Sequence, residues 1–359
     1  MAGLVLNSFS YRGTEALARR PLKLRQILGR SGPHRVLTTA ESAGDKKFAD
    51  YKPKTAFLFP GQGAQTVGMA KDVVNEVPKA KELFEHASDI LGYDLLKVCA
   101  EGPKERLDKT EISQPAIYVA SLAAVEKLRL TEGDEAAQKA DVACGLSLGE
   151  YTALAFAGAF SFEDGLKLVD LRGKSMQQAA DAQPSAMVSV IGLDADKTAE
   201  LCEKASHEVG KGEGVRIANY LCNGNYAVSG GVPGCEAVER LAKPDFKARM
   251  TVRLAVAGAF HTHFMQPAVE KLREALAGTK VVTPRIPVIS NVDAEPHSDP
   301  EVIKDILARQ VTSPVLWEAT MKTLLEKGLE NSYEIGPNKV IAGIFKRIDK
   351  KHNIQNVQV

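Results

Sequence analysis

Two kinds of hydrophobic pattern alternate along the chain after about residue 53, and together they predict an α/β fold. Short apolar runs that end in Gly, Pro or polar turn residues predict the buried strands of a sheet, at 55–60, 142–144, 286–290 and 332–337. Helical spacing of apolar residues predicts the helices, which reach to about 130, follow Ser147, span 161–182, begin again near His261, span 300–310 and 317–327, and close the chain.

The hydrophobic pattern changes in the segment from about 185 to 256 and predicts a second, smaller unit. Its runs follow the order strand, helix, strand, strand, helix, strand, over 186–192, 194–209, 216–220, 226–230, 233–243 and 247–256. That order is the one of a ferredoxin-like unit. We therefore expect a large α/β subdomain, built from 53–182 and 258–359, with a small ferredoxin-like subdomain inserted at 183–257.

The first 50 residues differ from the rest in charge and are not expected to belong to the folded domain. They contain nine basic and four acidic residues, a net of +5, whereas the whole chain of 359 residues carries a formal +1. Basic, acid-poor and hydroxyl-rich N-termini are typical of organelle transit peptides, so residues 1–50 are predicted to be one. A disordered tail or a nucleic-acid-binding arm is the alternative. The remainder carries about −4, which does not favour nucleic acid as a partner.

Composition indicates a globular chain with no membrane span. Hydrophobic residues make up 44% and charged residues 25%, and no apolar run is long enough to cross a bilayer. Five scattered cysteines, with no CxxC pair, predict reduced, unpaired thiols and no metal site. Cys144 among them is expected to be a small buried apolar residue.

One pentapeptide carries candidate chemistry, namely Gly145-Leu146-Ser147-Leu148-Gly149. A G-x-S-x-G alone is also common in ordinary turns. Here an apolar run precedes it and an alanine-rich helical pattern follows it, which is the strand–turn–helix context of a nucleophile elbow. The glycines would let strand and helix approach closely, and the Ser147 hydroxyl would stand at the helix N-terminus.

A serine nucleophile needs a base within hydrogen-bond reach, and His261 is the best candidate. It follows an apolar run and opens a predicted helix, whereas His263, two positions on, would face roughly the other way. No Asp or Glu between Ser147 and His261 has a strand-end context, so we expect a Ser–His dyad in which a carbonyl or amide orients the ring. Four further histidines lie among charged or turn residues and are expected at the surface: His86, His207, His297 and His352.

Arg172 is the second unusual residue, since it lies in an otherwise amphipathic helical stretch. It is either a helix-surface arginine or a guanidinium aimed into the cleft. In the second case it would give two parallel hydrogen bonds to a substrate carboxylate.

Taken together, these residues and several further motifs resemble a known family, the malonyl-CoA:acyl-carrier-protein malonyltransferases of type II fatty acid synthesis. The resemblance covers about residue 53 to the end and is greatest to the plant plastid form. Two residues depart from the usual pattern, Leu146, where many bacterial members have histidine, and Asn338, in a segment that is GPGK-like elsewhere. The motifs that carry it are Phe59-Pro60-Gly61-Gln62-Gly63-Ala64-Gln65, Ser113-Gln114-Pro115-Ala116, the elbow with Glu150-Tyr151, Arg172, Gly258-Ala259-Phe260-His261, Ser290-Asn291-Val292, Arg309-Gln310, Ser313-Pro314-Val315-Leu316-Trp317 and Glu334-Ile335-Gly336-Pro337.

The resemblance implies a fold and a role for each site residue. The fold would be an α/β-hydrolase-like large subdomain with the inserted ferredoxin-like one. Ser147 would be the nucleophile and His261 the base, with the Gln310 carbonyl orienting the ring. The oxyanion hole would be formed by the backbone amides of Gln62 and Leu148, and Arg172 would bind the malonyl carboxylate. Possible further substrate contacts are Gln114, Asn219 and Phe260.

The resemblance also implies the substrate, the partner and the compartment. Malonyl-CoA would donate the acyl group, and the phosphopantetheine thiol of acyl carrier protein would accept it, with no cofactor of the enzyme's own. We expect a monomer in the plastid stroma, with the mitochondrial matrix as the alternative. An esterase or thioesterase that shares the elbow, and a non-enzymatic docking subunit, are the competing functions.

Carrier proteins are acidic, so docking on a slightly acidic chain requires a local basic patch. The densest candidate, which we call the basic patch, consists of Lys243, Lys247, Arg249 and Arg253. A solvated strand face is the alternative interpretation of these four residues.

Overall fold

The computed structural model describes residues 47–359, and a parallel sheet of five strands organises much of that chain. The strand order is β7-β2-β1-β8-β9, and every neighbouring pair is parallel. The first strand, β1, is therefore central, which makes the sheet an open α/β sheet with long crossover connections. The strands are β1 (Thr55–Phe59), β2 (Val142–Gly145), β7 (Val288–Ile289), β8 (Asn331–Ile335) and β9 (Asn353–Val357).

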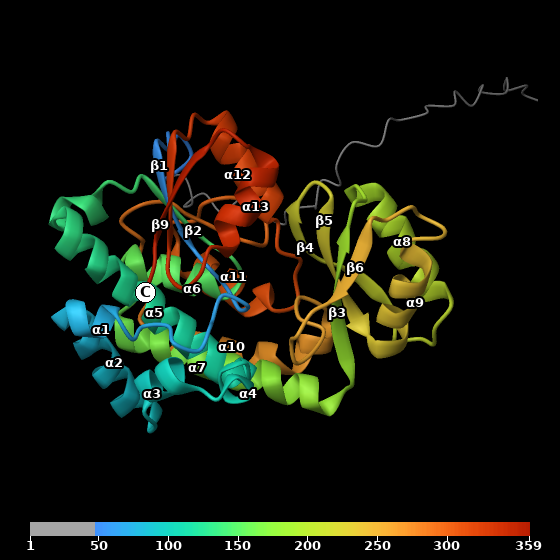
Figure 1. Ribbon diagram of the computed structural model, residues 1–359, viewed down its shortest axis with the longest axis horizontal. Helices are drawn as coiled ribbons and strands as arrows, with labels where there is room; N and C mark the ends of the chain where they lie inside the picture. The colour runs from blue at the N-terminus through green and yellow to red at the C-terminus, as the bar shows by residue number, and fades with distance from the viewer. Residues whose placement is uncertain (1–46) are drawn as a thin grey trace, which may run out of the picture. The chain divides into compact units, whose positions relative to one another are not determined.

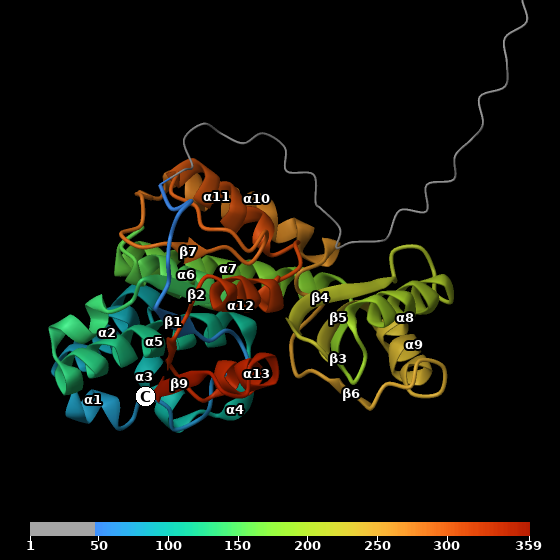
Figure 2. The ribbon, with the colours of Figure 1, turned by 90° about the horizontal axis from the view of Figure 1, so that it is seen from above.

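Helices cover both faces of this sheet, which explains why its strands read as continuous apolar runs. Along β1, Phe57 and Phe59 face one apolar cluster, whereas Ala56 and Leu58 face another. The first cluster is completed by α2 (Pro78–Leu91), α5 (Thr110–Glu132), α6 (Leu148–Phe156), α7 (Phe162–Ala182), α10 (Gln266–Gly278) and α11 (Pro300–Gln310). The second cluster is completed by α12 (Trp317–Glu326) and α13 (Val340–Ile348), which lie together in both views (Figures 1 and 2).

Short helices link β1 to α5. They are α1 (Val73–Glu76), α3 (Leu95–Glu101) and α4 (Lys104–Leu107). Two 3₁₀ turns, η1 (Asp134–Gln138) and η2 (His263–Met265), precede β2 and α10. The helix α7 is capped by Ser161, whose hydroxyl accepts a hydrogen bond from the Asp164 amide at 3.0 Å.

A second sheet is antiparallel and has the ferredoxin-like order β4-β5-β3-β6. Its strands are β3 (Ser185–Ile191), β4 (Val215–Cys222), β5 (Asn225–Gly231) and β6 (Met250–Arg253). The helices α8 (Ala195–His207) and α9 (Val232–Ala242) pack on one face of it through a separate apolar cluster (Figure 1). The expected α/β fold class with its two sheets is confirmed. The boundaries at 182 and 257 remain a prediction.

Four element predictions are corrected by the structure. The predicted strand at 247–256 is only β6, because Lys247 has a positive φ of 63° that a strand cannot accommodate. The strand predicted at 286–290 is also shorter in the structure, where only the two residues of β7 form it. The helix predicted near His261 begins at Gln266, after η2, because His261 itself has a φ of 61°. The strand β9 is missing from the prediction, since its polar sequence at the sheet edge has no alternating pattern.

The helices and the cysteines of the described chain can be compared with the expectations from composition. Within residues 47–359, no helix has the length and apolar character needed to cross a bilayer. All five cysteines are free and buried, as expected, and Cys144 lies fully inside on β2.

Candidate active site

The loop between β2 and α6 is a strained turn with Ser147 at its apex. Ser147 has φ 53° and ψ −104°, a backbone conformation that costs a non-glycine residue free energy. Both flanking positions require glycine, because a side chain at either would clash with the backbone. A Cβ on Gly145 would lie 1.8 Å from the Gly149 carbonyl carbon, and one on Gly149 would lie 2.1 Å from the Phe59 oxygen. The strand–turn–helix context expected for G-x-S-x-G is therefore confirmed.

Two buried polar residues hold this turn, and the sequence analysis assigned no role to either. The side chain of Asn291 accepts a hydrogen bond from the Ser147 amide at 2.6 Å and donates one to the Gly145 carbonyl at 2.7 Å. The Asn291 amide in turn donates to Glu150 Oε2 at 3.0 Å. The sequence did contain a signal for the position of Asn291. This residue follows a predicted strand, and the carboxyl ends of parallel strands share one edge of the sheet, where Ser147 also lies.

His261 lies beside the serine in the geometry of a dyad. Its Nε2 is 2.9 Å from Ser147 Oγ and its Nδ1 is 3.0 Å from the main-chain oxygen of Gln310. A carbonyl only accepts, so Nδ1 carries the proton in this bond and Nε2 is left to accept the serine hydroxyl. A carbonyl thus orients the ring, as expected. His263, by contrast, is exposed.

The surroundings keep this imidazole neutral. His261 is 3% exposed, and burial is the main reason why its pKa falls from 6.5 to about 4. The positive charge of Arg172 lowers the pKa further, whereas the hydrogen bond to Gln310 opposes the shift. At neutral pH the ring is therefore able to take a proton.

Arg172 enters the same site from α7 and is 1% exposed, so the interpretation as a surface arginine is wrong. Its guanidinium donates to Ser147 Oγ at 3.0 Å, to Gln310 Oε1 at 2.9 Å and to Gln114 Oε1 at 2.8 Å. All three acceptors are neutral, and among residues 47–359 no carboxylate forms an ion pair with it. Burial lowers the pKa of Arg172, but a guanidinium stays protonated at neutral pH.

Gln310 connects the members of the site. Besides the bonds already described, its amide donates to the Ser147 carbonyl at 3.0 Å and to Glu150 Oε2 at 2.6 Å. Burial raises the pKa of Glu150 to about 7, although the bonds from Gln310 and Asn291 oppose the shift. The side chain of Gln310 therefore links the serine, the arginine and a buried carboxyl group.

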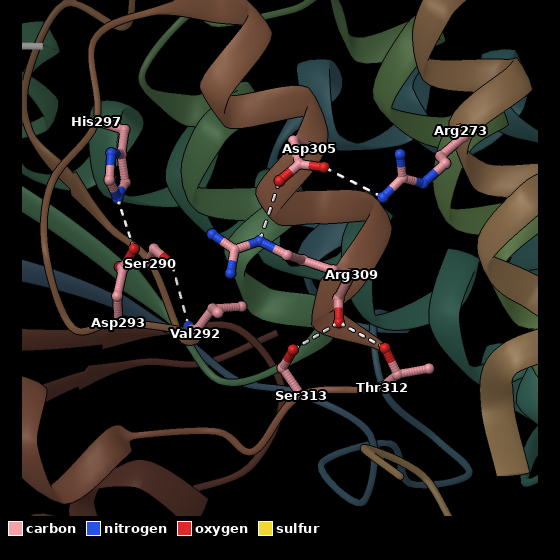
Figure 3. A network of polar contacts seen from close by, with 9 residues as sticks. All are labelled: Arg273, Ser290, Val292, Asp293, His297, Asp305, Arg309, Thr312 and Ser313. Carbon is pink, nitrogen blue, oxygen red and sulfur yellow. Dashed lines mark hydrogen bonds and ion pairs between the residues drawn. The ribbon is translucent and has the colours of Figure 1, made fainter. Parts of the chain in front are cut away.

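The turn that carries the Gln310 carbonyl is fixed at the end of α11 (Figure 3). The carbonyl of Arg309 accepts from the hydroxyls of Thr312 at 3.1 Å and Ser313 at 2.9 Å. Along the helix, Asp305 forms ion pairs with both Arg309 and Arg273. In the same view Ser290 Oγ accepts from the Val292 amide at 3.1 Å, which fixes the turn around Asn291.

The residues expected at an oxyanion hole belong to the elbow and to the turn that packs against it. The amide of Leu148 is the first of α6, and the first amides of a helix have no acceptor within it. Gln62 lies in the turn after β1, which packs against the elbow, since a Cβ on Gly61 would be 2.2 Å from the Leu146 oxygen. The Gln62 side chain donates to Thr110 at 3.3 Å. These positions permit two amides to converge near Ser147.

The three residues predicted as further substrate contacts lie in different surroundings. Gln114 is buried and orients Arg172 rather than facing solvent. Phe260 is 6% exposed and its ring belongs to the apolar core. Asn219 is partly exposed on β4, where it forms a β-bridge with Val315.

The structure accommodates both residues that depart from the usual pattern of the family. The departure at Leu146 is accommodated because its side chain packs into the apolar cluster beneath α12 and α13. Asn338 has a φ of 65°, the conformation in which asparagine is the usual replacement for glycine.

Two of the four histidines expected at the surface are not there. His352 stacks on Phe345, with ring centroids 4.4 Å apart, and contacts Ser332 Oγ at 2.8 Å. His297 is half-buried and contacts Asp293 at 3.0 Å. The polar sequence around each histidine did not reveal these partners, which partly cover both rings.

Comparison with known proteins places this geometry in a family. The model of the acyl transferase domain matches residues 56–359. A malonyl-CoA-acyl carrier protein transacylase of Bacillus subtilis is 39% identical over 298 residues, which cover 83% of this chain and 91% of that protein. The mitochondrial malonyl-CoA-acyl carrier protein transacylase of Mus musculus is 38% identical, covering 96% of this chain and 92% of its own.

A solved structure agrees. It is a malonyl-transacylase in complex with its type II PKS acyl-carrier protein, and it matches with a TM-score of 0.79 at 35% identity, covering 85% of this chain and 96% of that one. Matches of this extent, together with a serine that contacts both a histidine and an arginine, show that the chain is an acyltransferase enzyme and belongs to the malonyl-CoA:acyl-carrier-protein transacylase family.

Proposed function

We propose that this enzyme transfers the malonyl group from malonyl-CoA to the phosphopantetheine thiol of acyl carrier protein. The observation that carries the proposal is the guanidinium of Arg172, buried against the Ser147 hydroxyl with only neutral partners. A buried cation without a counter-charge is costly, and a substrate carboxylate beside the reacting carbonyl would compensate it. A malonyl thioester has its carboxylate in that position.

In the proposed first half-reaction, Ser147 Oγ attacks the thioester carbon while His261 Nε2 accepts the hydroxyl proton. The backbone amides of Gln62 and Leu148 stabilise the oxyanion, a contribution typically worth ~10²–10³ in rate per donor. Collapse breaks the carbon–sulfur bond, and the departing CoA sulfur takes the proton from His261. The product is a malonyl ester on Ser147.

In the second half-reaction the acceptor thiol loses its proton to His261 and attacks this ester. The carbon–oxygen bond breaks and the proton returns to Ser147 Oγ, so the enzyme is regenerated. The overall kinetics are ping-pong. Throughout, Gln310 holds the ring of His261 through its carbonyl, and Gln114 holds Arg172.

Acyl carrier protein as the acceptor is supported by the names of the relatives and by the malonyl-transacylase solved with its carrier protein. For the docking site we propose the basic patch. All four of its residues are exposed, and Arg253 is paired with Glu239, so that Lys243, Lys247 and Arg249 carry the attraction.

For the compartment we propose the plastid stroma, on the resemblance to the plant form. The mitochondrial matrix is the alternative, and the mitochondrial relative from mouse supports it. The transit peptide proposed for residues 1–50 lies almost entirely outside the described residues. A monomer remains a prediction.

Ser147→Ala tests the nucleophile. The variant should form no covalent adduct with malonyl-CoA, whereas the wild type should gain one malonyl group on Ser147, both measured by mass spectrometry of intact protein and peptides. Because only a hydroxyl is removed, thermal unfolding should stay close to that of the wild type. An adduct on the alanine variant would rule out Ser147, and release of free malonate in place of transfer would favour a thioesterase.

Arg172→Ala tests the acid specificity. Malonyl transfer should fall by about two to four orders of magnitude, because the carboxylate loses its charged partner. The use of acetyl-CoA relative to malonyl-CoA should rise, as measured by kcat/KM for the two donors. Equal losses for both donors would show that Arg172 only supports the fold of the site.

The pH profile tests the proposed base. Protonation removes the base, so kcat/KM for malonyl-CoA should be flat near neutrality and fall only as pH approaches the His261 pKa of about 4. The enzyme is returned to neutral pH after each acidic measurement, to exclude unfolding as the cause of the loss. An acid limb near pH 6.5, the ordinary histidine value, would contradict a desolvated base.

The docking site is tested by reversing Lys247 and Arg249 to glutamate. Use of carrier protein should weaken, and most strongly at low salt, because the attraction is electrostatic. Self-malonylation should remain intact. Reversal of the exposed pair Lys79 and Lys81 on α2 is the matched control. Equal loss in both half-reactions would assign the two residues to the fold instead.

A further inference from the structure

The antiparallel sheet reaches directly into the loop that orients the histidine. The register of β4 against β5 shifts between Ile217 and Asn219, and at this irregularity β4 pairs with a segment outside its own sheet. The Val315 amide donates to the Ala218 carbonyl at 2.8 Å, and the Tyr220 amide donates to the Val315 carbonyl at 2.9 Å. The chain that follows Gln310 is therefore bonded to β4.

Arg216 extends this connection to His261. It lies on β4, and its Nη2 donates to the main-chain oxygen of His261 at 2.7 Å and also to that of Thr312. The first oxygen belongs to the loop that carries the imidazole, and the second lies two residues beyond Gln310. One guanidinium thus joins the two backbone segments whose spacing sets the bond from Nδ1 to the Gln310 carbonyl.

The other contacts fix each segment separately. The hydroxyls of Thr312 and Ser313 tie the turn to the end of α11 (Figure 3), and the Ser229 hydroxyl donates to the Phe260 carbonyl at 2.9 Å. Each of these side chains bonds to one segment only, so they join the two segments only indirectly, through the paired strands β4 and β5. Among the side chains in these contacts, Arg216 alone donates to both segments.

The backbone at His261 needs such a restraint. Its φ of 61° is unfavourable for a residue with a side chain, and such a conformation persists only where the surroundings over-determine it. A donor to the His261 carbonyl supplies one of those constraints, because it fixes the plane of the peptide that follows.

We propose that Arg216 is a positioning residue of this site: it clamps the His261 and Thr312 backbones together and thereby keeps the imidazole between Ser147 and Gln310. The inference rests on the proposed function and assigns the antiparallel sheet a part in it. Arg216 is exposed along its side chain, touches neither Ser147 nor Arg172 in the described structure, and acts only through His261.

The charge of Arg216 has a separate, measurable effect. The charged groups around the imidazole are Arg172 from α7, Arg216 from β4 and, through Gln310, the buried Glu150 from α6. Both arginines lower the pKa of His261. Removing the charge of Arg216 should therefore raise that pKa, whereas lysine should preserve it and lose only the two-carbonyl clamp.

The test compares Arg216→Met and Arg216→Lys with the wild type and with Arg240→Met. Arg240 is an exposed arginine of α9, paired with Glu208, and serves as the matched control. Stopped-flow self-malonylation and transfer to carrier protein are measured as functions of pH. In parallel, the His261 imidazole is titrated by ¹⁵N NMR without any substrate.

For Arg216→Met we expect kcat to fall by on the order of 10²-fold in both half-reactions, since an ångström-scale misplacement of a base has that cost. KM for malonyl-CoA should change little, and the His261 titration should move to higher pH. Arg216→Lys should keep the wild-type titration but recover only part of kcat. Arg240→Met should match the wild type in every measurement.

Two outcomes would overturn the inference. A raised KM with unchanged kcat would make Arg216 a substrate-binding residue, and wild-type kinetics in Arg216→Met would give it no role. Failure of the proposed function is distinguishable, because then the wild type itself would form no malonyl adduct. In that case the substrate-independent titration still reports whether the charge of Arg216 acts on the His261 imidazole.

Discussion

The site is organised by a positive charge that the protein buries without neutralising. Arg172 is surrounded by amide and hydroxyl acceptors, so its charge is oriented but not cancelled. The same charge helps to keep His261 neutral, and its contact with Ser147 Oγ favours the ionised form of that oxygen. One buried charge therefore acts on the proposed nucleophile, on the proposed base and on the proposed recognition of an acidic acyl group. It also explains why Gln310 and Gln114, rather than carboxylates, stand beside the guanidinium.

Much of the fold and the central pair of the site could be predicted from the sequence, since both have local signals. The elbow can be recognised because its strand, its glycines and its helix follow one another directly in the sequence. Where the signal was local but ambiguous, the prediction failed at the ends of elements. Lys247 and His261 adopt left-handed conformations that no hydrophobic pattern reveals, and this shortened a strand and delayed a helix.

The parts that were missed are partnerships between distant segments. Glu150 reads as an ordinary charged residue in the first turn of a helix, and only the folded chain shows it inside, against Asn291 and Gln310. The same holds for Arg216, whose partners lie in two other segments. Side chains that satisfy buried backbone groups carry no periodic signal, because their spacing is set by the fold and not by a helix or strand. The role of such residues becomes visible only with coordinates.

The order of the strands in the parallel sheet has a consequence for when the serine becomes reactive. The central strand β1 is made first, but its two neighbours, β2 and β8, follow much later in the chain, and the residues that orient the base lie between them in sequence. Contacts between such distant segments form late in folding because a long loop must close first. An extended or half-folded chain therefore carries Ser147 as an ordinary alcohol. Chemical reactivity is in this sense a property of the completed tertiary structure.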